Sequence, residues 1–174
     1  MLLEDDVLAR SIGDALVALR AKVAVAETTA GGLISARLLS VAGASAWFER
    51  GVVCYSREAK IEATGADAGV LAAHGAVSRE SVVAMAEGLL ARTGAQYAIA
   101  ESGIAGPPGG HRSPKPVGTS MIAIATAAGT TFEEHLFAGS RIEVMEAVAQ
   151  RTIELLWEHV AAAAGIGAAE PSAD

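Results

Sequence analysis

Apolar residues follow two different spacings along this chain of 174 residues, and the spacings predict its elements. Short continuous apolar runs are typical of buried strands, whereas apolar positions three and four residues apart are typical of amphipathic helices. Ser56 and Ser78 are expected to cap two further helices, and Gly94 to end the second of them. Strands are predicted over 23–26, 51–55, 97–100, 119–127 and 131–138, and helices over 3–19, 33–39, 68–73, 79–93 and 142–160, with a short helix after Ser56.

The order of these elements predicts an α/β fold. Strands that alternate with helices form a sheet covered on both faces. The last two strands are separated only by a turn at Ala128-Gly129, which predicts an antiparallel hairpin and therefore a mixed sheet. The length suits one domain, which we expect to span 1–164, with a frayed tail over 165–174.

Composition narrows the function. The chain is 52% hydrophobic but only 4% aromatic, so its interior is built mostly from Ala, Val, Leu and Ile. A net charge of -7 argues against a nucleic-acid partner, which needs a basic surface. A small anionic ligand is still compatible with this charge, because a few backbone amides and one or two cations suffice to bind it.

The sequence also favours a reducing compartment. Cys54 is the single cysteine, so no intrachain disulfide forms, and we expect a cytoplasmic protein. Residues 1–6 carry acids where a signal peptide carries bases, and no apolar run is long enough to span a membrane. No metal site is expected, since the four histidines lack ligand spacing: His74, His111, His135 and His159.

The segment Glu27-Thr28-Thr29-Ala30-Gly31-Gly32 is the strongest candidate site in the chain. It joins a predicted buried strand to a predicted helix, whose N-terminal N–H groups attract phosphate, carboxylate or an oxyanion. A hydroxyl at such a turn is a candidate nucleophile. The alternative is that Thr28 or Thr29 only caps the helix.

A second candidate is the Gly- and Pro-rich loop over 103–118, which follows a predicted strand. Gly103 and Gly106 offer a cradle for a ligand, but the loop lacks the Gly-Lys-Ser/Thr ending of a nucleotide-triphosphate loop. Arg112 and Lys115 are candidates to neutralise a monophosphate, or are exposed loop charges. Arg141 begins the last predicted helix, where the helix dipole disfavours a cation, so we expect a ligand or a carboxylate beside it.

Several blocks of sequence, in order, resemble the CinA C-terminal domain family, the nicotinamide mononucleotide deamidases. They cover roughly residues 23–156. The blocks are Ala-Glu-Thr-Thr-Ala-Gly-Gly at 26–32, Gly-Val-Val-Cys-Tyr-Ser-Arg-Glu-Ala-Lys at 51–60, Gly-Ala-Val-Ser at 75–78 with Met-Ala-Glu-Gly at 85–88, Gly-Ile-Ala-Gly-Pro at 103–107 running to Lys-Pro-Val-Gly-Thr at 115–119, and Gly-Ser-Arg at 139–141.

The resemblance implies a three-layer α/β/α sandwich with a mixed, mostly parallel sheet. It implies hydrolysis of the carboxamide of nicotinamide mononucleotide to nicotinic acid mononucleotide and ammonia, in pyridine nucleotide salvage and without a cofactor. The family's serine nucleophile, with its nearby lysine and tyrosine, falls on Thr28, Lys60 and Tyr55. The resemblance also suggests a homodimer or higher homo-oligomer, and a place among the competence-damage inducible proteins.

Alternatives remain for each role at this stage. Lys60 is a base only if burial or nearby cations lower its pKa, and otherwise is a solvated surface lysine. Tyr55 either relays a proton or packs its ring. The N–H groups of Gly31 and Gly32 stabilise an oxyanion, or these glycines allow close packing. Glu27 orients Lys60 or the substrate amide, or pairs with another base.

The residue at the serine position departs from the family pattern of Ala-Glu-Ser-Cys-Thr-Gly-Gly. Thr28 has a hydroxyl, but its extra methyl restricts χ1 and crowds the attack. Ser102, after Glu101, stands where a threonine is expected, and is a substitute hydroxyl. The first hypothesis is therefore the deamidase; the second is a nucleotide-binding or assembly domain that does not turn over; a third is a hydrolase of another amide.

Overall fold

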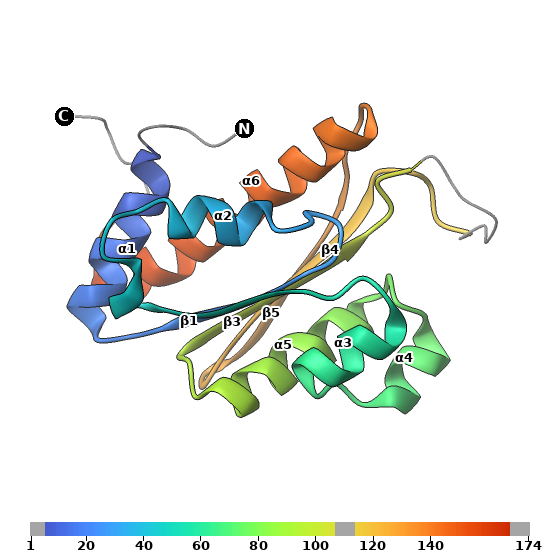
Figure 1. The fold of residues 1–174 in the computed structure, drawn as a ribbon, viewed down its shortest axis with the longest axis horizontal. Helices are drawn as coiled ribbons and strands as arrows, with labels where there is room; N and C mark the ends of the chain where they lie inside the picture. Colours follow the sequence, from blue (N-terminus) through green and yellow to red (C-terminus); the bar gives the residue numbers. More distant parts are fainter. Residues whose placement is uncertain (1–5, 107–113, 168–174) are drawn as a thin grey trace.

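The computed structural model describes residues 6–106 and 114–167, which form one mixed sheet with helices on both faces (Figure 1). The strands are β1 (Val23–Glu27), β2 (Phe48–Val53), β3 (Tyr97–Gly103), β4 (Thr119–Thr126) and β5 (Gly129–Leu136). The helices are α1 (Val7–Leu19), α2 (Leu33–Leu39), α3 (Arg57–Thr64), α4 (Ala68–His74), α5 (Arg79–Thr93) and α6 (Arg141–Ala164), with a 3₁₀ turn at Ala44–Ala46.

The sheet has the strand order β2-β1-β3-β4-β5. The strand β1 pairs in parallel with β2 and β3, whereas β4 pairs antiparallel with β3 and β5. The α/β fold, the mixed sheet and the late hairpin are therefore confirmed. Parallel and antiparallel pairs are equally numerous, rather than mostly parallel, because the hairpin joins β3 directly and contributes two antiparallel pairs.

Helices α1, α2 and α6 cover one face of the sheet, and α3, α4 and α5 cover the other (Figure 1). Side chains alternate between the two layers along each strand. In β1, Val23 and Val25 join the core under α6, while Ala24 and Ala26 join the core under α5. These alternating faces decide on which side of the sheet the polar residues beyond the strand end emerge.

Most predicted boundaries hold, and the caps explain them. Ser56 and Ser78 accept hydrogen bonds at the starts of α3 and α5, and Gly94 ends α5, as predicted. The first helix begins at Val7, later than predicted, because the Asp6 carboxylate caps it. The last helix runs beyond the predicted residue 160 to its cap at Gly165.

The second strand was placed too late. It begins at Phe48 rather than at residue 51 and ends at Val53 rather than at 55. It lies at the edge of the sheet, so exposed Glu49 and Arg50 occupy strand positions and hide the apolar pattern. Among the described residues, no helix is long and apolar enough to cross a membrane.

Candidate functional site

The carboxyl ends of β1 and β3 lie side by side, and each carries a hydroxyl. The parallel register ends with Ala26 paired to Ala100, and Thr28 and Ser102 each follow two residues beyond this last pair, at the same edge of the sheet. Strand alternation directs both side chains toward the α5 layer, as for Ala26 and Ala100. Both hydroxyl residues are buried, and the Ser102 hydroxyl has no hydrogen-bond partner in the described structure.

The two threonines do not cap α2. The Thr28 hydroxyl donates to the carbonyl oxygen of Cys54, just after β2, at 3.2 Å. The Thr29 hydroxyl is buried with no hydrogen-bond partner among the described residues. The N-cap of α2 is Gly32, which has no side chain to accept a bond. The capping alternative is therefore wrong for both threonines.

Glu27 performs the capping instead. Its carboxylate accepts the N–H groups of Gly32 at 2.9 Å, Ile34 at 3.0 Å and Ser35 at 2.8 Å, together with the Ser35 hydroxyl at 2.5 Å. The alternation of β1 turns Glu27 toward α2, on the opposite face from Thr28. The carboxylate is therefore engaged at the start of α2, and the predicted role of Glu27 toward Lys60 or the substrate amide stays a prediction.

The same bonds correct the predicted oxyanion site. Because the Gly32 N–H donates to Glu27, it is not free to bind an oxyanion. The Gly31 N–H has no acceptor in the described part of the chain, and Gly31 is exposed. Its φ of +66° favours glycine. Gly31 remains a candidate oxyanion donor.

Lys60 is a buried amine rather than a solvated one. It lies in the first turn of α3 and is 2% exposed, and its Nζ donates to the backbone carbonyl of Tyr55 at 3.0 Å. Burial lowers the pKa of the Lys60 amine, while nearby Cys54 and Glu101 oppose that change. An amine in this environment loses its proton more readily than a surface lysine, as a general base must.

Cys54 links Lys60 to Thr28. Burial raises the pKa of the Cys54 thiol, while the Lys60 charge and a hydrogen bond with Thr28 oppose that change. Both candidate catalytic groups therefore lie near Cys54. The hydroxyl of the first turn and the amine of α3 occupy one region of the molecule, at the ends of β1 and β2.

Tyr55 and Arg141 meet at the surface of this region. The Tyr55 ring is 68% exposed, so it does not pack in the core as the alternative held. Arg141 donates to the Tyr55 hydroxyl at 3.5 Å and to the carbonyl of Gly106 at 3.0 Å. Among the described residues, Arg141 makes no hydrogen bond to a carboxylate, so its guanidinium presents a positive charge that an anion would neutralise.

The glycines of the following loop serve packing. A Cβ on Gly103 would lie 2.7 Å from Ser120 Oγ and 3.0 Å from Thr29 Oγ1, and a Cβ on Gly106 would lie 2.5 Å from Val117. Side chains therefore fill the space that a cradle needs at these two positions. Lys115 is half-buried at the far end of the loop. Arg112 and His111 lie outside the described residues.

Sequence reasoning missed the role of Glu101. Its carboxyl is fully buried, and its Oε1 accepts the N–H groups of Thr28 at 2.5 Å and Ala30 at 2.9 Å. Its Oε2 has no partner among the described residues. Burial raises the pKa of Glu101 to about 7. The available signal was an acid directly after the apolar run of β3.

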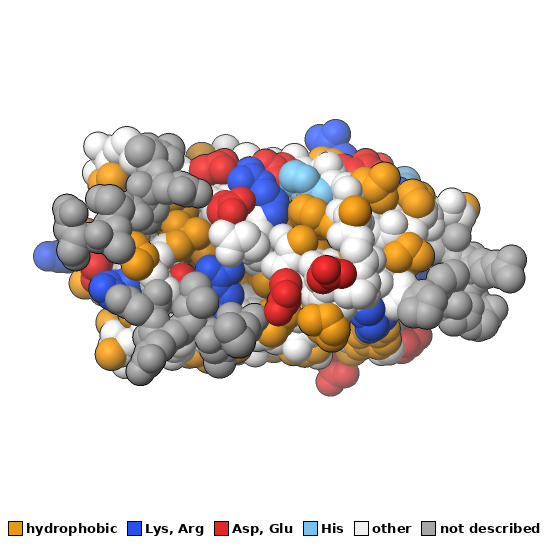
Figure 2. Space-filling view, turned by 90° about the horizontal axis from the view of Figure 1, so that it is seen from above, with side chains coloured by type: hydrophobic (Ala, Val, Ile, Leu, Met, Phe, Trp, Pro, Cys, Tyr) orange, Lys and Arg blue, Asp and Glu red, His pale blue; other side chains and the backbone are white. Residues whose placement is uncertain are grey.

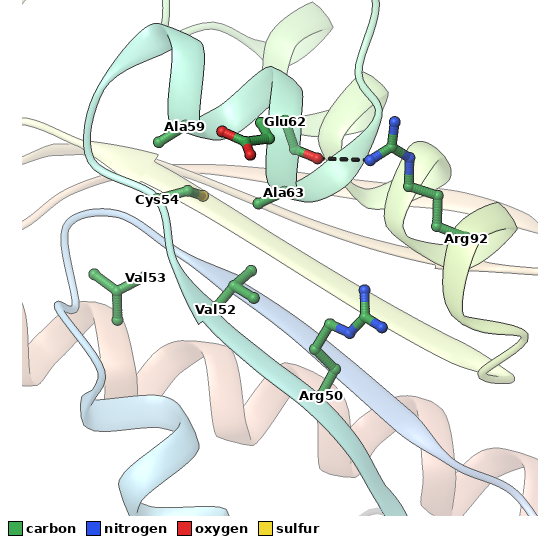
Figure 3. A pocket seen from close by; sticks show the side chains of 8 residues that line it. All are labelled: Arg50, Val52, Val53, Cys54, Ala59, Glu62, Ala63 and Arg92. Carbon is green, nitrogen blue, oxygen red and sulfur yellow. Dashed lines mark hydrogen bonds between the residues drawn. The ribbon is translucent and has the colours of Figure 1, made fainter.

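A hollow of about 570 Å³ lies beside β2 and α3 (Figure 3). Cys54 and Ala63 form part of its wall, and Arg50 and Arg92 extend toward it. Arg92 is held by a hydrogen bond to the Glu62 carbonyl at 2.6 Å, in the last turn of α3. Neither Thr28 nor Lys60 lines this hollow.

The surface over α1, α2 and α6 mixes acidic, basic and apolar side chains without a continuous basic stripe (Figure 2). Among the described residues, no group of three His, Cys, Asp or Glu side chains is arranged to hold a metal ion.

Known proteins resemble this chain along most of its length. The CinA C-terminal domain family matches residues 5–160. The chain is 44% identical over 152 residues to nicotinamide-nucleotide amidohydrolase PncC of Escherichia coli K12, covering 87% of this chain and 92% of that protein. A CinA superfamily protein from Klebsiella pneumoniae has the same fold, with a TM-score of 0.83 at 34% identity over 89% of this chain and 96% of that one.

A competence/damage inducible protein from Agrobacterium tumefaciens also shares the fold, with a TM-score of 0.80 at 38% identity over 86% of this chain and 91% of that one. The family match covers nearly all of the described residues, and both the sequence blocks and the strand order agree with it. The chain belongs to the CinA C-terminal domain family.

Proposed function

We propose that this protein hydrolyses the carboxamide of nicotinamide mononucleotide, releasing ammonia and nicotinic acid mononucleotide. The observation that carries the proposal is the shared location of the Thr28 hydroxyl and the buried Lys60 amine near Cys54. Similarity to a relative named nicotinamide-nucleotide amidohydrolase supports the substrate. A place in cytoplasmic pyridine nucleotide salvage, and a homo-oligomeric state, belong to the same proposal.

The first half-reaction forms an ester. The Thr28 hydroxyl first breaks its hydrogen bond to the Cys54 carbonyl. Its oxygen then attacks the carboxamide carbon, and the neutral Lys60 amine takes the hydroxyl proton. The carbonyl electron pair moves onto oxygen, where the Gly31 N–H stabilises it. As the tetrahedral intermediate collapses, the C–N bond breaks, and Lys60 gives its proton to the leaving nitrogen, which departs as ammonia.

The second half-reaction restores the enzyme. Water attacks the ester carbon and gives its proton to neutral Lys60. The bond to Thr28 then breaks, and the proton returns to the Thr28 oxygen. The product carries a carboxylate in place of the amide. The Ser102 hydroxyl, which has no hydrogen-bond partner among the described residues, is the proposed contact for the substrate carboxamide.

Arg141 is the proposed contact for the phosphate. Its guanidinium lies between the Gly106 carbonyl and the Tyr55 hydroxyl, and it makes no ion pair among the contacts of the described residues. A planar guanidinium binds phosphate with paired hydrogen bonds. The loop that begins at Gly103 and Gly106 and ends near Lys115 is also proposed to lie beside the substrate.

Incubation of the purified protein with nicotinamide mononucleotide tests this function. We expect ammonia and nicotinic acid mononucleotide to appear in equal amounts, as measured by an ammonia assay and by chromatography. A panel of other carboxamides should react more slowly. Ammonia from another amide, with none from the mononucleotide, would assign the site to a different substrate.

The second candidate function is binding of the mononucleotide without turnover. The hydrogen bond of the Thr28 hydroxyl to the Cys54 carbonyl favours it, because that bond holds the hydroxyl on an acceptor other than Lys60. The methyl group of Thr28 further restricts its rotation. Calorimetric binding without ammonia release would support this candidate. Ammonia release restored by Thr28→Ser would identify that methyl as the cause.

A further inference from the structure

The Glu101 carboxyl takes no part in the steps above, although it is fully buried in the candidate site. One of its oxygens accepts two N–H groups, and the other makes no hydrogen bond within 3.5 Å among the described residues, although the nearby Thr29 hydroxyl lowers the Glu101 pKa. Burying an acidic group with an unpaired oxygen is costly. A group retained at such a cost is a functional candidate when it also contacts the reacting residues.

The hydrogen bonds of Glu101 determine where Thr28 lies. They connect β3 to the N–H groups of Thr28 and Ala30, on either side of Thr29 in the turn. Without an acceptor, two buried N–H groups would be left unpaired. The bonds therefore fix the backbone that carries the proposed nucleophile.

Glu101 also lies close to Lys60 through Thr28. Glu101 accepts the Thr28 N–H, the Thr28 hydroxyl donates to the carbonyl of Cys54, and Lys60 Nζ donates to the next carbonyl, that of Tyr55. The titratable groups that influence Glu101 or respond to it are Glu27 on β1, Cys54 after β2 and Lys60 on α3. On β4 the residue paired with Glu101 is apolar Ile122. The first charged residue of α6 is Arg141, which is engaged with Gly106 and Tyr55. The charged form of Lys60 is favoured when Glu101 is ionised, and the neutral form when Glu101 is protonated.

We propose that Glu101 is a positioning residue of the deamidase site, which holds the Thr28 turn in place and sets the pH range over which Lys60 accepts a proton. This inference rests on the proposed function for its link to turnover. Its structural part, the coupling of Glu101 to the Thr28 turn and to Lys60, stands without it. Glu101 acts through Thr28 and Lys60 and touches no reacting atom.

Glu101→Gln separates the two effects. The amide oxygen of glutamine still accepts the two N–H groups, so the turn stays in place, while the negative charge is gone. We expect the rise of kcat/KM with pH, which reports the loss of a proton from Lys60, to move to lower pH by about one pH unit. A pH profile of kcat/KM that coincides with that of the unchanged protein would overturn the proposal.

Glu27→Gln is the matched control. Glu27 is also a buried glutamate that accepts backbone N–H groups of the same turn, but it has no direct influence on the Lys60 amine. We expect this variant to lose stability and to keep the midpoint of the pH profile. A midpoint that moved equally in both variants would assign the effect to general loss of charge near the turn and would contradict a specific role for Glu101.

An NMR titration tests the coupling without turnover. In the unchanged protein, the amide resonances of Thr28 and Ala30 should shift together with a midpoint at pH about 7, where Glu101 titrates. In Glu101→Gln that transition should vanish, and the Lys60 side-chain carbon should titrate at lower pH. If the amide resonances of Thr28 and Ala30 do not shift between pH 6 and 8, about one unit on either side of 7, the proposal is contradicted. This test uses the unchanged protein and does not depend on the folding of any variant.

The two measurements keep the proposals distinct. Absence of ammonia from the unchanged protein, with the coupled titration present, would refute the deamidase function and leave the positioning of Thr28 supported. Ammonia release with no coupled titration would refute the role of Glu101 and leave the deamidase function supported.

Discussion

Buried polar side chains around the first turn divide into those that stabilise the fold and those that oppose it. Glu27 uses both carboxylate oxygens to cap α2, so its burial is compensated. Lys60 and Glu101 are buried with fewer partners than their charges require. Among the described residues, Lys60 Nζ donates to the Tyr55 carbonyl, and Glu101 Oε2 has no hydrogen-bond partner. This is the pattern expected of residues retained for chemistry.

Replacing Lys60 by methionine should therefore separate activity from stability. Methionine has similar length and no charge to bury, so we expect the melting temperature of Lys60→Met to equal or exceed that of the unchanged protein. Ammonia release should fall by at least about 100-fold with the loss of the base. Calorimetry and the ammonia assay give the two values.

Lys22→Met is the control for that comparison, because Lys22 is a half-exposed lysine paired with Glu49 at the surface. Its stability should change by less than about 0.5 kcal/mol and its activity should be retained. A marked loss of stability in Lys60→Met, with activity preserved, would make Lys60 a structural residue.

The resemblance placed Thr28 and Lys60 in one site, whereas nothing in the sequence indicated that the Glu27 carboxylate accepts hydrogen bonds from the start of α2. The resemblance brought Thr28 and Lys60 together without coordinates, and both lie near Cys54. The side of the sheet on which each residue of the turn emerges depends on strand alternation continued past the strand end. That alternation directs the Glu27 side chain toward α2 and the Thr28 side chain toward the layer of α3. The sequence alone does not show at which residue the alternation ends.

At the scale of elements, the candidate site forms where the ends of three strands lie near the start of a helix. The ends of β1, β2 and β3 bring Thr28, Cys54 and Ser102, and the start of α6 brings Arg141. The existence and the order of the helices and strands could be predicted from the spacing of apolar residues and from the residues that cap the helices. The bounds of β2 could not, because an edge strand needs apolar residues on fewer positions than a central one.

The start of α6 should control affinity rather than rate. In Arg141→Met the proposed phosphate contact is lost, so KM for nicotinamide mononucleotide should rise about 10- to 100-fold with kcat little changed. Nicotinamide riboside, which lacks the phosphate, should be affected much less. Steady-state kinetics with both compounds provide the test.

Arg57→Met is a matched control, because Arg57 likewise follows a serine cap as the first residue of a helix. It should leave KM for the mononucleotide unchanged. Equal loss of affinity for the nucleotide and the riboside in Arg141→Met would show that Arg141 does not bind the phosphate.

At the scale of the whole molecule, the two layers differ in chemistry. Ala24, Ala26, Ala98 and Ala100 form the sheet face under α5, consistent with a chain poor in aromatic residues. The three-layer arrangement could be predicted from the alternation of strands and helices. Its internal electrostatics could not, because the pKa of Glu101 depends on complete burial in the folded state.

This burial should make global stability depend on pH. The pKa of Glu101 rises from 4.5 to about 7 on folding, so the folded state holds a proton that the unfolded state has lost between these values. The contribution of Glu101 to the free energy of unfolding therefore falls as pH rises from 4.5 to about 7. At 1.36 kcal/mol per pH unit the loss is on the order of 3 kcal/mol.

Glu101→Gln removes this dependence. Urea unfolding at pH 8 should find the variant more stable than the unchanged protein, and the difference should shrink as the pH approaches 4.5. A variant that is less stable than the unchanged protein at pH 8 would contradict the burial of an ionised carboxylate.

The central claim is that Thr28 forms a bond to the substrate carbonyl with Lys60 as its base. The most direct measurement is rapid acid quenching of the protein with nicotinamide mononucleotide, followed by mass spectrometry of the peptides. We expect the acyl group of nicotinic acid mononucleotide on Thr28, absent in Thr28→Ala and in Lys60→Met, with ammonia release lost in both variants. An acyl group on Ser102, or ammonia released by Thr28→Ala at the unchanged rate, would contradict it.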